Sequence, residues 1–471
     1  MSEQPGNDPH SFRDNIATAD QTGKRIWVYP AQPKGRLYRA RTIVAIFLLA
    51  FLFIAPFIKL HGQPLILLDV LNRNFIIFGL VFRPQDFYLF VLAILTLLVF
   101  VVQFTAIFGR LFCGWVCPQT IFMEMVFRRI EYWIDGSPAK QRRLREGPWS
   151  EVKVFKWVVK YAVFFVLSWV ICNVFLAYII GVDALFKIIT DPPGQHIGGL
   201  IAMIVFTFLF YGVFSWFREQ ACTLVCPYGR LQGVLIDSGS IAVTYDYDRG
   251  EPRGKFRKDG DRSDKGDCIN CRACVSVCPT GIDIRDGSQL ECVNCTACID
   301  ACNSVMRRVK LPEGLIRYSS EDRLKGIAGF RLRGRVVVYT IALVALVGLL
   351  TTLLVLRTDV QTNIFRTPGM LFFETENGNI RNLYSVKMVN KTFDSMTVQI
   401  RLKSPATATL QMVSGDVVLK PEGIAETALF VEMPRDKLFG PSTLVVFDVV
   451  RDGEVIDEVK SSFMGPGAGK K

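Results

Sequence analysis

Five predominantly apolar runs, each long enough to cross a bilayer, constrain this chain more than any other feature of its sequence. They are residues 42–58, 87–108, 158–180, 199–217 and 336–356. A helix of about 20 apolar residues spans the hydrocarbon core of a membrane, and lipid offers no hydrogen-bond partner to an open backbone. Each run is therefore predicted to be a transmembrane helix, and the chain is predicted to be a multi-pass membrane protein.

A sixth apolar stretch, residues 64–82, differs because Asp69, Asn72 and Arg73 stand in its middle. A charged side chain at the centre of a bilayer costs roughly 2.5–3.5 kcal/mol on insertion scales. We therefore expect an interfacial or re-entrant loop here. The first run follows about forty polar residues and lacks a small-residue cleavage site, so we expect an anchor and not a removable signal peptide.

The distribution of lysine and arginine predicts how the chain is threaded. Segments 1–40, 110–153 and 218–335 hold 6, 8 and 20 of these residues, whereas loops 61–86 and 181–197 hold 2 and 1. Basic residues concentrate in cytoplasmic loops. The alternation therefore predicts a cytoplasmic N-terminus and an external C-terminal part. These loops account for most of the net charge of +12, so we expect no nucleic-acid partner.

Eight of the 13 cysteines fall within 35 residues, in the blocks "CINCRACVSVCP" and "CVNCTACIDACN". Each block reads Cys-x2-Cys-x2-Cys-x3-Cys, the spacing of bacterial two-cluster ferredoxins, in which the fourth cysteine of a block binds the other block's cluster. The first [4Fe–4S] cluster is predicted at Cys268, Cys271, Cys274 and Cys302. The second is predicted at Cys292, Cys295, Cys298 and Cys278.

Disulfides and zinc are the alternatives for these cysteines. Disulfides do not suit a loop assigned to the reducing side of the membrane. Zinc sites need only Cys-x2-Cys pairs and do not explain the doubled spacing. One departure from the ferredoxin pattern is Asn303, which follows Cys302 where Pro279 follows Cys278. It leaves ligation intact but is expected to change the local turn.

Two Cys-x3-Cys-Pro motifs, "CGWVCP" and "CTLVCP", follow the second and fourth apolar runs, 109 residues apart. Proline is favoured at the first position of a helix, so Pro118 and Pro227 predict helix starts. Cys117 and Cys226 then fall at helix N-caps, where the helix dipole favours a thiolate. Cys113 and Cys222 lie about one turn earlier. After Pro118, an apolar face (Ile121, Met125, Ile130) and a polar face (Glu124, Arg128, Arg129) predict an amphipathic helix.

The duplication suggests that both motifs approach one another on the cytoplasmic side. Four converging thiolates would form a soft site suited to Cu(I), or pairs able to cycle through a disulfide. The alternative is that these cysteines only pack as small apolar residues at helix ends.

The remaining cysteine and the three histidines carry less chemistry. Cys172 stands alone inside the third run and is expected to serve in packing. A membrane haem needs two histidines at one depth, but His10 lies in a tail and His61 and His196 lie in outer loops. We therefore expect no haem. A role for His61 and His196 near an outer metal or quinol stays open.

From about residue 380 the sequence alternates with period two in seven short stretches, separated by turn formers such as Ser414-Gly415 and Asp452-Gly453. Seven strands in about ninety residues predict an immunoglobulin-like β-sandwich. It has no cysteine and no cluster of metal ligands, so we expect a docking or structural module.

These features predict a multi-domain α + β membrane protein. Its expected parts are a cytoplasmic tail, a four-helix membrane region with the two Cys-x3-Cys-Pro motifs, a ferredoxin-like domain, a fifth span and the outer sandwich. Their expected bounds are residues 1–40, 41–235, 236–335, 336–356 and 357–471.

Five spans, the twin "CGWVCP" and "CTLVCP" motifs, the doubled ferredoxin pattern and the terminal sandwich together resemble the CcoG/FixG/RdxA family. The resemblance covers the chain from about residue 25, although the polyferredoxins NapH and NosR share single parts. It implies a bacterial inner-membrane protein with a periplasmic C-terminal domain. It also implies reduction of Cu(II) to Cu(I) for assembly of the cbb3-type cytochrome c oxidase, with copper passed to that oxidase's insertion machinery.

On this resemblance, Cys113, Cys117, Cys222 and Cys226 form or flank the copper site, and a cytoplasmic donor reduces the clusters. Two other functions stay open: a quinol-oxidising conduit like NapH, and a non-enzymatic assembly scaffold. The sequence names neither the donor nor the copper recipient, and it leaves open whether the protein is a homo-oligomer.

Overall fold

The structure of the protein is a computed structural model that describes residues 17–20, 22, 24–60, 62–71, 74–82, 86–255, 264–326, 333–369, 371–421, 423–438 and 440–466. The chain divides into two compact units, Met1–Gly348 and Leu349–Lys471. All 13 cysteines belong to the first unit, and none of them is in a disulfide.

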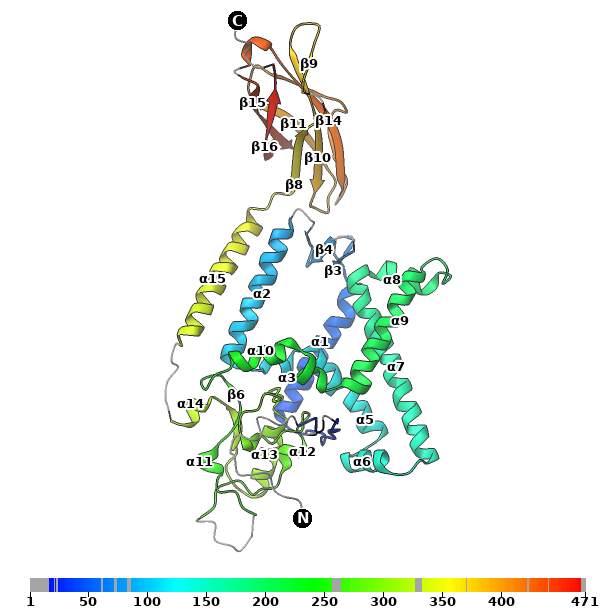
Figure 1. Cartoon of the computed structure of the whole chain (residues 1–471), viewed down its shortest axis with the longest axis vertical. Coiled ribbons are helices and arrows are strands. Elements are labelled where there is room, and N and C mark those ends of the chain that lie inside the picture. Colours follow the sequence, from blue (N-terminus) through cyan, green and yellow to red (C-terminus); the bar gives the residue numbers. More distant parts are fainter. Residues whose placement is uncertain are drawn as a thin grey trace. The chain divides into compact units, whose positions relative to one another are not determined.

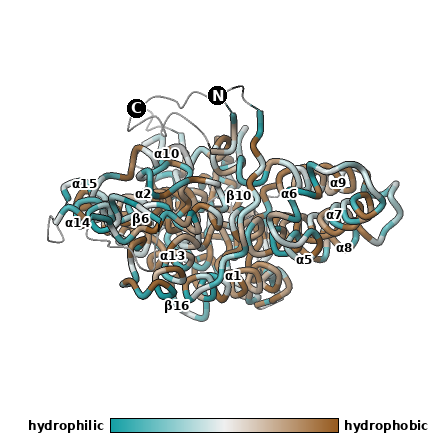
Figure 2. Tube along the Cα trace, turned by 90° about the horizontal axis from the view of Figure 1, so that it is seen from below, coloured by the Kyte–Doolittle hydropathy of each residue, from teal (hydrophilic) through white to brown (hydrophobic). Residues whose placement is uncertain are grey.

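Among the described residues, five helices are long and apolar enough to cross a membrane, which confirms the five predicted spans. They are α1 (Arg36–Ile54) with the 3₁₀ turn η2 (Ala55–Phe57), α2 (Phe87–Phe108), α7 (Glu151–Ile180), α9 (Ile197–Gly212) with the π-helical η5 (Val213–Phe217), and α15 (Gly334–Val355) (Figure 1). Figure 2 shows hydrophobic residues around spans such as α1 and α9. Helix α7 begins upstream of the predicted run because Ser150 caps it by accepting from the Lys153 N–H at 3.3 Å.

The helix after the first cysteine pair packs between two spans. It runs as α4 (Pro118–Ile121), the π-helical η4 (Phe122–Phe127) and α5 (Arg128–Ile134). Phe127 stacks on Phe214 of η5 with ring centroids 4.7 Å apart and meets Phe164 of α7 edge-on at 4.9 Å. All three rings are buried. This aromatic core fixes the segment that carries Cys117 relative to α7 and α9.

The stretch 64–82 forms strands, which the sequence analysis did not predict. The antiparallel sheet consists of β3 (Ile66–Asp69), β4 (Asn74–Ile77) and β5 (Leu80–Phe82), beside the small hairpin of β1 (Lys59–Leu60) and β2 (Gln63–Pro64). Phe78 and Gly79 have φ angles of 50° and 81°. Two positive φ angles in a two-residue loop are the signature of a tight hairpin turn.

The remaining helices of the first unit are short and lie in the connections. Those between spans are α3 (Leu111–Trp115), α6 (Pro138–Glu146), α8 (Val182–Thr190), the π-helical η6 (Ala221–Val225) and α10 (Pro227–Leu235). The ferredoxin region contains β6 (Ala242–Tyr245), α11 (Tyr247–Gly250), α12 (Ala273–Ser276), η7 (Ile284–Asp286), α13 (Ala297–Arg308), β7 (Ile316–Ser319) and α14 (Glu321–Leu324). Strands β6 and β7 pair antiparallel and bring the two ends of this region together.

The start of α1 is held by the ferredoxin region. Asp300 of α13 accepts the backbone N–H groups of Leu37 and Tyr38 at 3.3 and 2.8 Å, so a carboxylate from a distant helix caps α1. A Cβ on Gly35 would lie 2.1 Å from the Asp300 side chain. The segment before α1 also pairs with this region, since the Ala31 N–H donates to the Ser276 carbonyl at 2.7 Å. Residues before the first span are therefore bound to the ferredoxin region.

The second unit is a β-sandwich. Its strands are β8 (Val360–Arg366), β9 (Phe373–Glu374), β10 (Ile380–Asn390), β11 (Met396–Ser404), β12 (Thr409–Met412), β13 (Val417–Leu419), β14 (Ile424–Met433), β15 (Ser442–Arg451) and β16 (Glu454–Met464), with the 3₁₀ turn η8 (Arg435–Lys437). One sheet has the order β12-β14-β10-β8 with β9 on β10, and the other has the order β13-β11-β15-β16.

Both sheets contribute to one hydrophobic core. Tyr384 of the first sheet and Phe447 of the second are fully buried and pack edge-on, with ring centroids 5.7 Å apart. The seven predicted strands are confirmed as β10 to β16. Strands β8 and β9 were not predicted, because they lie before residue 380, where the predicted period-two alternation begins.

Candidate metal centre

The two cysteine blocks adopt the same backbone conformation at equivalent positions. Asn270 and Arg272 of the first block have φ angles of 52° and 55°, and Asn294 and Thr296 of the second have 53° and 66°. Asparagine enters this left-handed region readily, but arginine and the β-branched threonine do so at a cost. The repetition indicates that both loops are built to curl around the same kind of object.

The structure brings the eight cysteines together in the two sets that the spacing predicts. One cavity is lined by Cys268, Cys271, Cys274 and Cys302, the first cysteine group. A second cavity is lined by Cys278, Cys292, Cys295 and Cys298, the second cysteine group, and Cys274 also reaches it. The fourth cysteine of each block thus crosses to the other block's cavity, and the two cavities are neighbours.

The chemistry of these cavities fits a [4Fe–4S] cluster. Burial raises the pKa of Cys292 and of Cys302 to about 12, so without metal these thiols are neutral at physiological pH. Within the described ranges, no three His, Cys, Asp or Glu side chains form a site for a single metal ion. A cluster does not require one, because each thiolate binds a different iron.

The two groups differ in their exposure. Cys271 of the first group is exposed, whereas Cys295 of the second is buried. Burial also raises the pKa of Cys298 far above its ordinary value. The first group is therefore the one that a soluble molecule can approach.

Asn303 gives the second block a different ending. Helix α13 continues through Cys302 to Arg308, and the Asn303 side chain accepts from the Gly314 N–H at 2.9 Å. In the first block, α12 ends at Ser276, and Pro279 follows Cys278. The asparagine therefore permits a longer helix, because a proline would remove a helical hydrogen bond.

Both Cys-x3-Cys-Pro motifs have the predicted local structure. Cys117 is the N-cap of α4 and Cys226 is the N-cap of α10, each with proline at the first helical position. Cys113 lies in α3, and Cys222 lies in the π-helical η6. Three π-helical segments, η4, η5 and η6, surround the motifs; such segments are rare and frequent at functional sites.

The two motifs meet. Gln232 of α10, which is fully buried, donates from Nε2 to the Cys113 Sγ at 3.2 Å. Burial raises the pKa of Cys222 to about 12, and the charges of Cys117, Cys113 and Cys226 add to this increase. These couplings mean that all four thiols share one neighbourhood.

The first motif lies directly on the loop of the second cysteine group. A Cβ on Gly114 would lie 2.4 Å from the Val293 carbonyl oxygen, so only glycine permits this approach. Cys113 packs against a small core that includes Val293 and Cys295. Trp115 Nε1 donates to the Tyr318 hydroxyl at 3.1 Å, and that hydroxyl donates to the Asn294 carbonyl at 2.9 Å.

Comparison with known proteins agrees with this arrangement. Residues 217–321 match the family model described as a 4Fe-4S dicluster domain, and residues 350–466 match the model described as the IG-like fold at the C-terminus of FixG. Residues 90–137 match a 4Fe-4S binding domain. The nitrogen fixation protein FixG of Rhizobium meliloti is 30% identical over 469 residues, which cover 88% of each chain.

The chain belongs to the FixG/RdxA family. Proteins RdxB and RdxA of Cereibacter sphaeroides are 34% and 30% identical to it. The alignments cover 84% of this chain and 86% of RdxB, and 81% of this chain and 83% of RdxA. This family member is an iron–sulfur protein of the membrane with a C-terminal immunoglobulin-like domain.

Sequence reasoning missed several residues at the site of this FixG/RdxA-family chain. Gln232 contacts Cys113. Arg41 Nε donates to the Gly114 carbonyl at 2.6 Å, and Arg110 Nη2 donates to the Gly229 carbonyl. Arg41 is 2% exposed and Arg110 is 6% exposed. Arg41 directly precedes the first apolar run and Arg110 follows the second, but this position did not mark either as buried, since arginine is seldom fully buried without a partner.

A network of buried ion pairs also links the segments next to the two motifs. Arg218, just before the second motif, makes two hydrogen bonds of 2.7 Å to the Glu131 carboxylate. Arg128 pairs with Glu124, lies 3.5 Å from Glu219, and is 1% exposed. The polar face predicted to include Arg128 is buried, because Glu219, which precedes the second motif, covers it.

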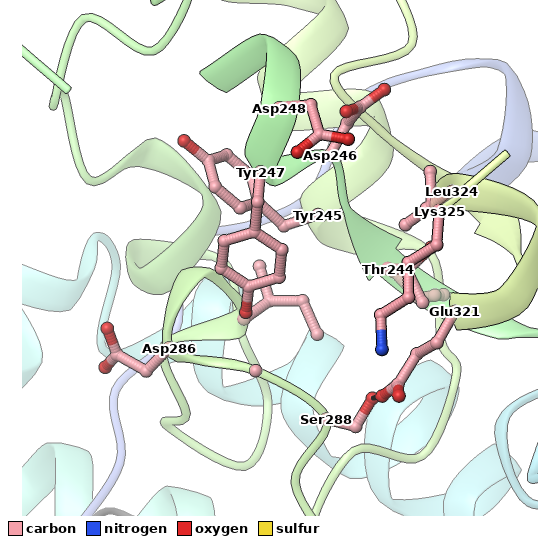
Figure 3. A pocket seen from close by; sticks show the side chains of 13 residues that line it. Thr244, Tyr245, Asp246, Tyr247, Asp248, Asp286, Ser288, Glu321, Leu324 and Lys325 are labelled. Atoms are coloured by element: carbon pink, nitrogen blue, oxygen red, sulfur yellow. Dashed lines mark hydrogen bonds between the residues drawn. The ribbon is translucent and has the colours of Figure 1, made fainter. Parts of the chain in front are cut away.

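A cavity of about 400 Å³ lies beside the first cysteine group (Figure 3). Tyr245 lines both this cavity and the first cysteine cavity. Within its lining, Asp246 pairs with Arg317 at 2.8 Å and Glu321 accepts from Ser288 at 2.7 Å. The cavity is separate from the four thiols.

The isolated cysteine and the histidines lie away from these groups. Cys172 is completely buried in α7, in accord with packing. His196 is the N-cap residue of α9 and lies 3.0 Å from the Asp191 carboxylate. His10 and His61 lie outside the described residues.

Proposed function

We propose that this FixG/RdxA-family protein is a membrane-bound electron-transfer protein that reduces Cu(II) to Cu(I) for assembly of a cbb3-type cytochrome c oxidase. The observation that carries the proposal is the approach of Gly114 to the Val293 carbonyl. It brings the first thiol motif onto the loop of the second cysteine group. Electrons that reach this loop meet four thiols suited to a soft metal ion.

In this proposal the first cysteine group holds one [4Fe–4S] cluster and the second group holds another. Bound clusters supply one-electron carriers at neighbouring positions. The exposed Cys271 marks the side that a cytoplasmic electron donor approaches. Cys113 marks the opposite end of the path, because it packs with Val293 and Cys295.

Copper is the substrate of the four thiols Cys113, Cys117, Cys222 and Cys226. Each Cu(II) gains one electron and becomes Cu(I), and the electron transfer itself breaks no bond. Thiolates prefer Cu(I), so they favour the reduced product. Because burial raises the pKa of Cys222 to about 12, copper binding there displaces a proton.

The proposed orientation places the N-terminus and both clusters in the cytoplasm and the β-sandwich in the periplasm. It is supported by the ends of the spans that meet the ferredoxin region. The start of α1 contacts Asp300, the end of α2 contacts Ile241, and the residue before α15, Arg333, pairs with Asp237. These ends alternate in chain direction as the basic loops require.

A second candidate is that the four thiols hold a third iron–sulfur cluster. The match of residues 90–137 to a 4Fe-4S binding domain, which includes Cys113 and Cys117, favours it. Iron analysis of the purified protein separates the two functions, because the copper proposal expects iron for two cubanes and the alternative expects iron for three.

The test of the proposal uses the full chain in detergent. The reduced protein is mixed with Cu(II) or with a quinone analogue, and the visible absorbance of the clusters is followed. Reoxidation by Cu(II) alone supports the proposal, reoxidation by the quinone supports a quinol conduit, and reoxidation by neither supports a scaffold.

Two variants test the role of the thiols: one changes the four motif cysteines, and the control changes one other cysteine. Replacing Cys113, Cys117, Cys222 and Cys226 with serine is expected to abolish Cu(II) reduction and to leave the iron of two cubanes. Cys172→Ser, buried outside both groups, is the control and is expected to retain both. Full Cu(II) reduction by the fourfold variant would contradict the proposal.

A further inference from the structure

The two cysteine groups differ in how the positive charges beside them are compensated. Arg285, beside the first group, is paired with Asp283, whose Oδ1 accepts from Arg285 Nε at 2.8 Å. The charges of Arg285 and Asp283 act in opposite directions on Cys274. Arg249, which acts on Cys302 of the same group, is paired with Asp267. Arg285 and Arg249 beside the first group are therefore neutralised, whereas Arg272, which also lines this cavity, is exposed, so solvent screens its charge.

Beside the second group stand two buried arginines without a carboxylate. Arg41 and Arg110 form no ion pair within the described part of the chain, and Arg41 Nη2 has no hydrogen-bond partner. A buried cation is strongly destabilising unless a negative group compensates it. Glu124, whose charge also acts on Cys295, is paired with Arg128, and no described carboxylate pairs with Arg41 or Arg110.

Each of these arginines binds a backbone carbonyl in or directly after a thiol motif and lies close enough to the second group for its charge to act there. Arg41 binds the carbonyl of Gly114, the residue that abuts Val293. Arg110 lines a cavity together with Cys292 and Asn294, and it binds the Gly229 carbonyl in the second motif. Their positive charges act on Cys295 and Cys292, respectively.

We propose that Arg41 and Arg110 are the counter-charges of the second cluster and raise its reduction potential above that of the first. A reduced cluster carries one more negative charge than an oxidised one, so a nearby uncompensated cation stabilises the reduced form. Burial of the second cluster by itself would lower its reduction potential, because it disfavours the added negative charge. The same burial reduces the screening of the two guanidinium charges, so their attraction prevails.

The consequence is a direction for electron flow. Electrons entering at the exposed Cys271 side move to the second cluster because it holds them more strongly, and the second cluster lies against Cys113. Arg41 and Arg110 act as positioning residues, since they bind backbone carbonyls in or directly after the thiol motifs and not the copper. This inference rests on the iron–sulfur ligation in the proposed function.

The experiment is a redox titration of the purified, cluster-containing full chain, followed by electron paramagnetic resonance. Two midpoint potentials are expected in the wild type. Cys271→Ser, at the exposed ligand, changes the signal of the first cluster and so assigns it. The first cluster is expected to have the lower potential, and the reverse order would overturn the proposal without any folding-sensitive variant.

Charge-removing variants test the cause. Arg110→Gln and Arg41→Gln are each expected to lower the potential of the second cluster only, reducing the equilibrium constant for electron transfer between the clusters about tenfold. For one electron this corresponds to about 59 mV. Arg110→Lys and Arg41→Lys keep the charge and are expected to keep most of the potential. Asp283→Asn, which leaves Arg285 unpaired, is expected to raise the potential of the first cluster.

Failure of this inference is distinct from failure of the proposed function. Intact iron content with an unchanged second potential in both glutamine variants, or equal shifts of both clusters, would overturn the role of the arginines. Absence of iron–sulfur signals from the wild-type protein would overturn the proposed function itself.

Discussion

The chain contains two duplicated cysteine elements, and they are held in place in opposite ways. The ferredoxin blocks are shaped locally, by left-handed residues such as Arg272 and Thr296 within the loops themselves. The Cys-x3-Cys-Pro motifs depend on side chains from elsewhere, such as Gln232 against Cys113 and Glu131 against Arg218. Local geometry therefore shapes the two cysteine cavities, and long-range packing positions the four thiols of the Cys-x3-Cys-Pro motifs.

The variant with the largest expected effect removes the buried ion pair of Arg218 and Glu131 near the thiol motifs. Arg218→Gln leaves the Glu131 carboxylate buried without its partner and is expected to destabilise the first unit by about 3–5 kcal/mol. Thermal unfolding in detergent measures the loss. The matched control is Arg307→Gln, whose pair with Glu313 is solvent-exposed on both sides and whose loss is expected to cost less than about 1 kcal/mol. Equal losses of stability in Arg218→Gln and Arg307→Gln would contradict the assignment of Arg218 and Glu131 as a stabilising buried ion pair.

The same ion pair predicts a pH dependence. Burial by itself raises the pKa of Glu131, but the charge and hydrogen bonds of Arg218 outweigh it, so the pKa lies below its ordinary value of 4.5. The stabilisation is therefore complete above pH 4.5 and is lost as the pH falls through the lowered pKa of the folded protein. The difference in unfolding temperature between wild type and Arg218→Gln should be largest near neutral pH. It should shrink as the pH falls, first through the raised pKa of Glu131 in the variant and then through its lowered pKa in the wild type.

A smaller effect comes from the contact between the motif and the second cysteine group. Gly114→Ala places a Cβ 2.4 Å from the Val293 carbonyl, and such overpacking typically costs about 1–3 kcal/mol. We expect slower Cu(II) reduction with retained iron. Gly212→Ala, where the added Cβ meets nothing within 4 Å, is the control. If Gly114→Ala lost its clusters, and not only its rate of Cu(II) reduction, the motif would instead be needed to hold the ferredoxin loop in shape.

The bond between α1 and α13 should matter less. Asp300→Ala removes the acceptor of the Leu37 and Tyr38 N–H groups and is expected to cost about 0.5–2 kcal/mol, as for other helix N-caps. Asp300→Asn keeps an acceptor oxygen and is expected to recover most of the loss. Hydrogen exchange at the start of α1 reports the change, and unaltered exchange in Asp300→Ala would contradict a capping role.

The smallest expected effect tests whether the ferredoxin blocks are shaped by their own loop residues. Thr296→Gly removes the strain of a β-branched residue at a φ of 66°. The relief of about 1–2 kcal/mol is partly offset by glycine's conformational entropy, so a net gain of up to about 1 kcal/mol is expected. Denaturant unfolding and iron content measure it. A loss of stability with loss of the second cluster would indicate that the Thr296 side chain, which donates to the Cys295 carbonyl, is required.

The sequence alone determined the parts of this protein whose information is local. Five apolar runs predicted the five spans, and period-two alternation predicted β10 to β16 of the sandwich. Pro118 and Pro227 predicted two helix starts with Cys117 and Cys226 at the caps. Spacing also predicted which cysteines line which cavity, because a loop of fixed length around a fixed object leaves few arrangements.

The tertiary structure decided what lies beside each element. Arg41, Arg110 and Gln232 are ordinary residues of helices or helix ends, and no local pattern distinguishes them from exposed ones. Arg128 follows an amphipathic pattern but is buried, because the second motif's lead-in covers its face with Glu219. Such contacts join residues far apart in the chain, so they depend on how spans and loops pack together and cannot be read from spacing.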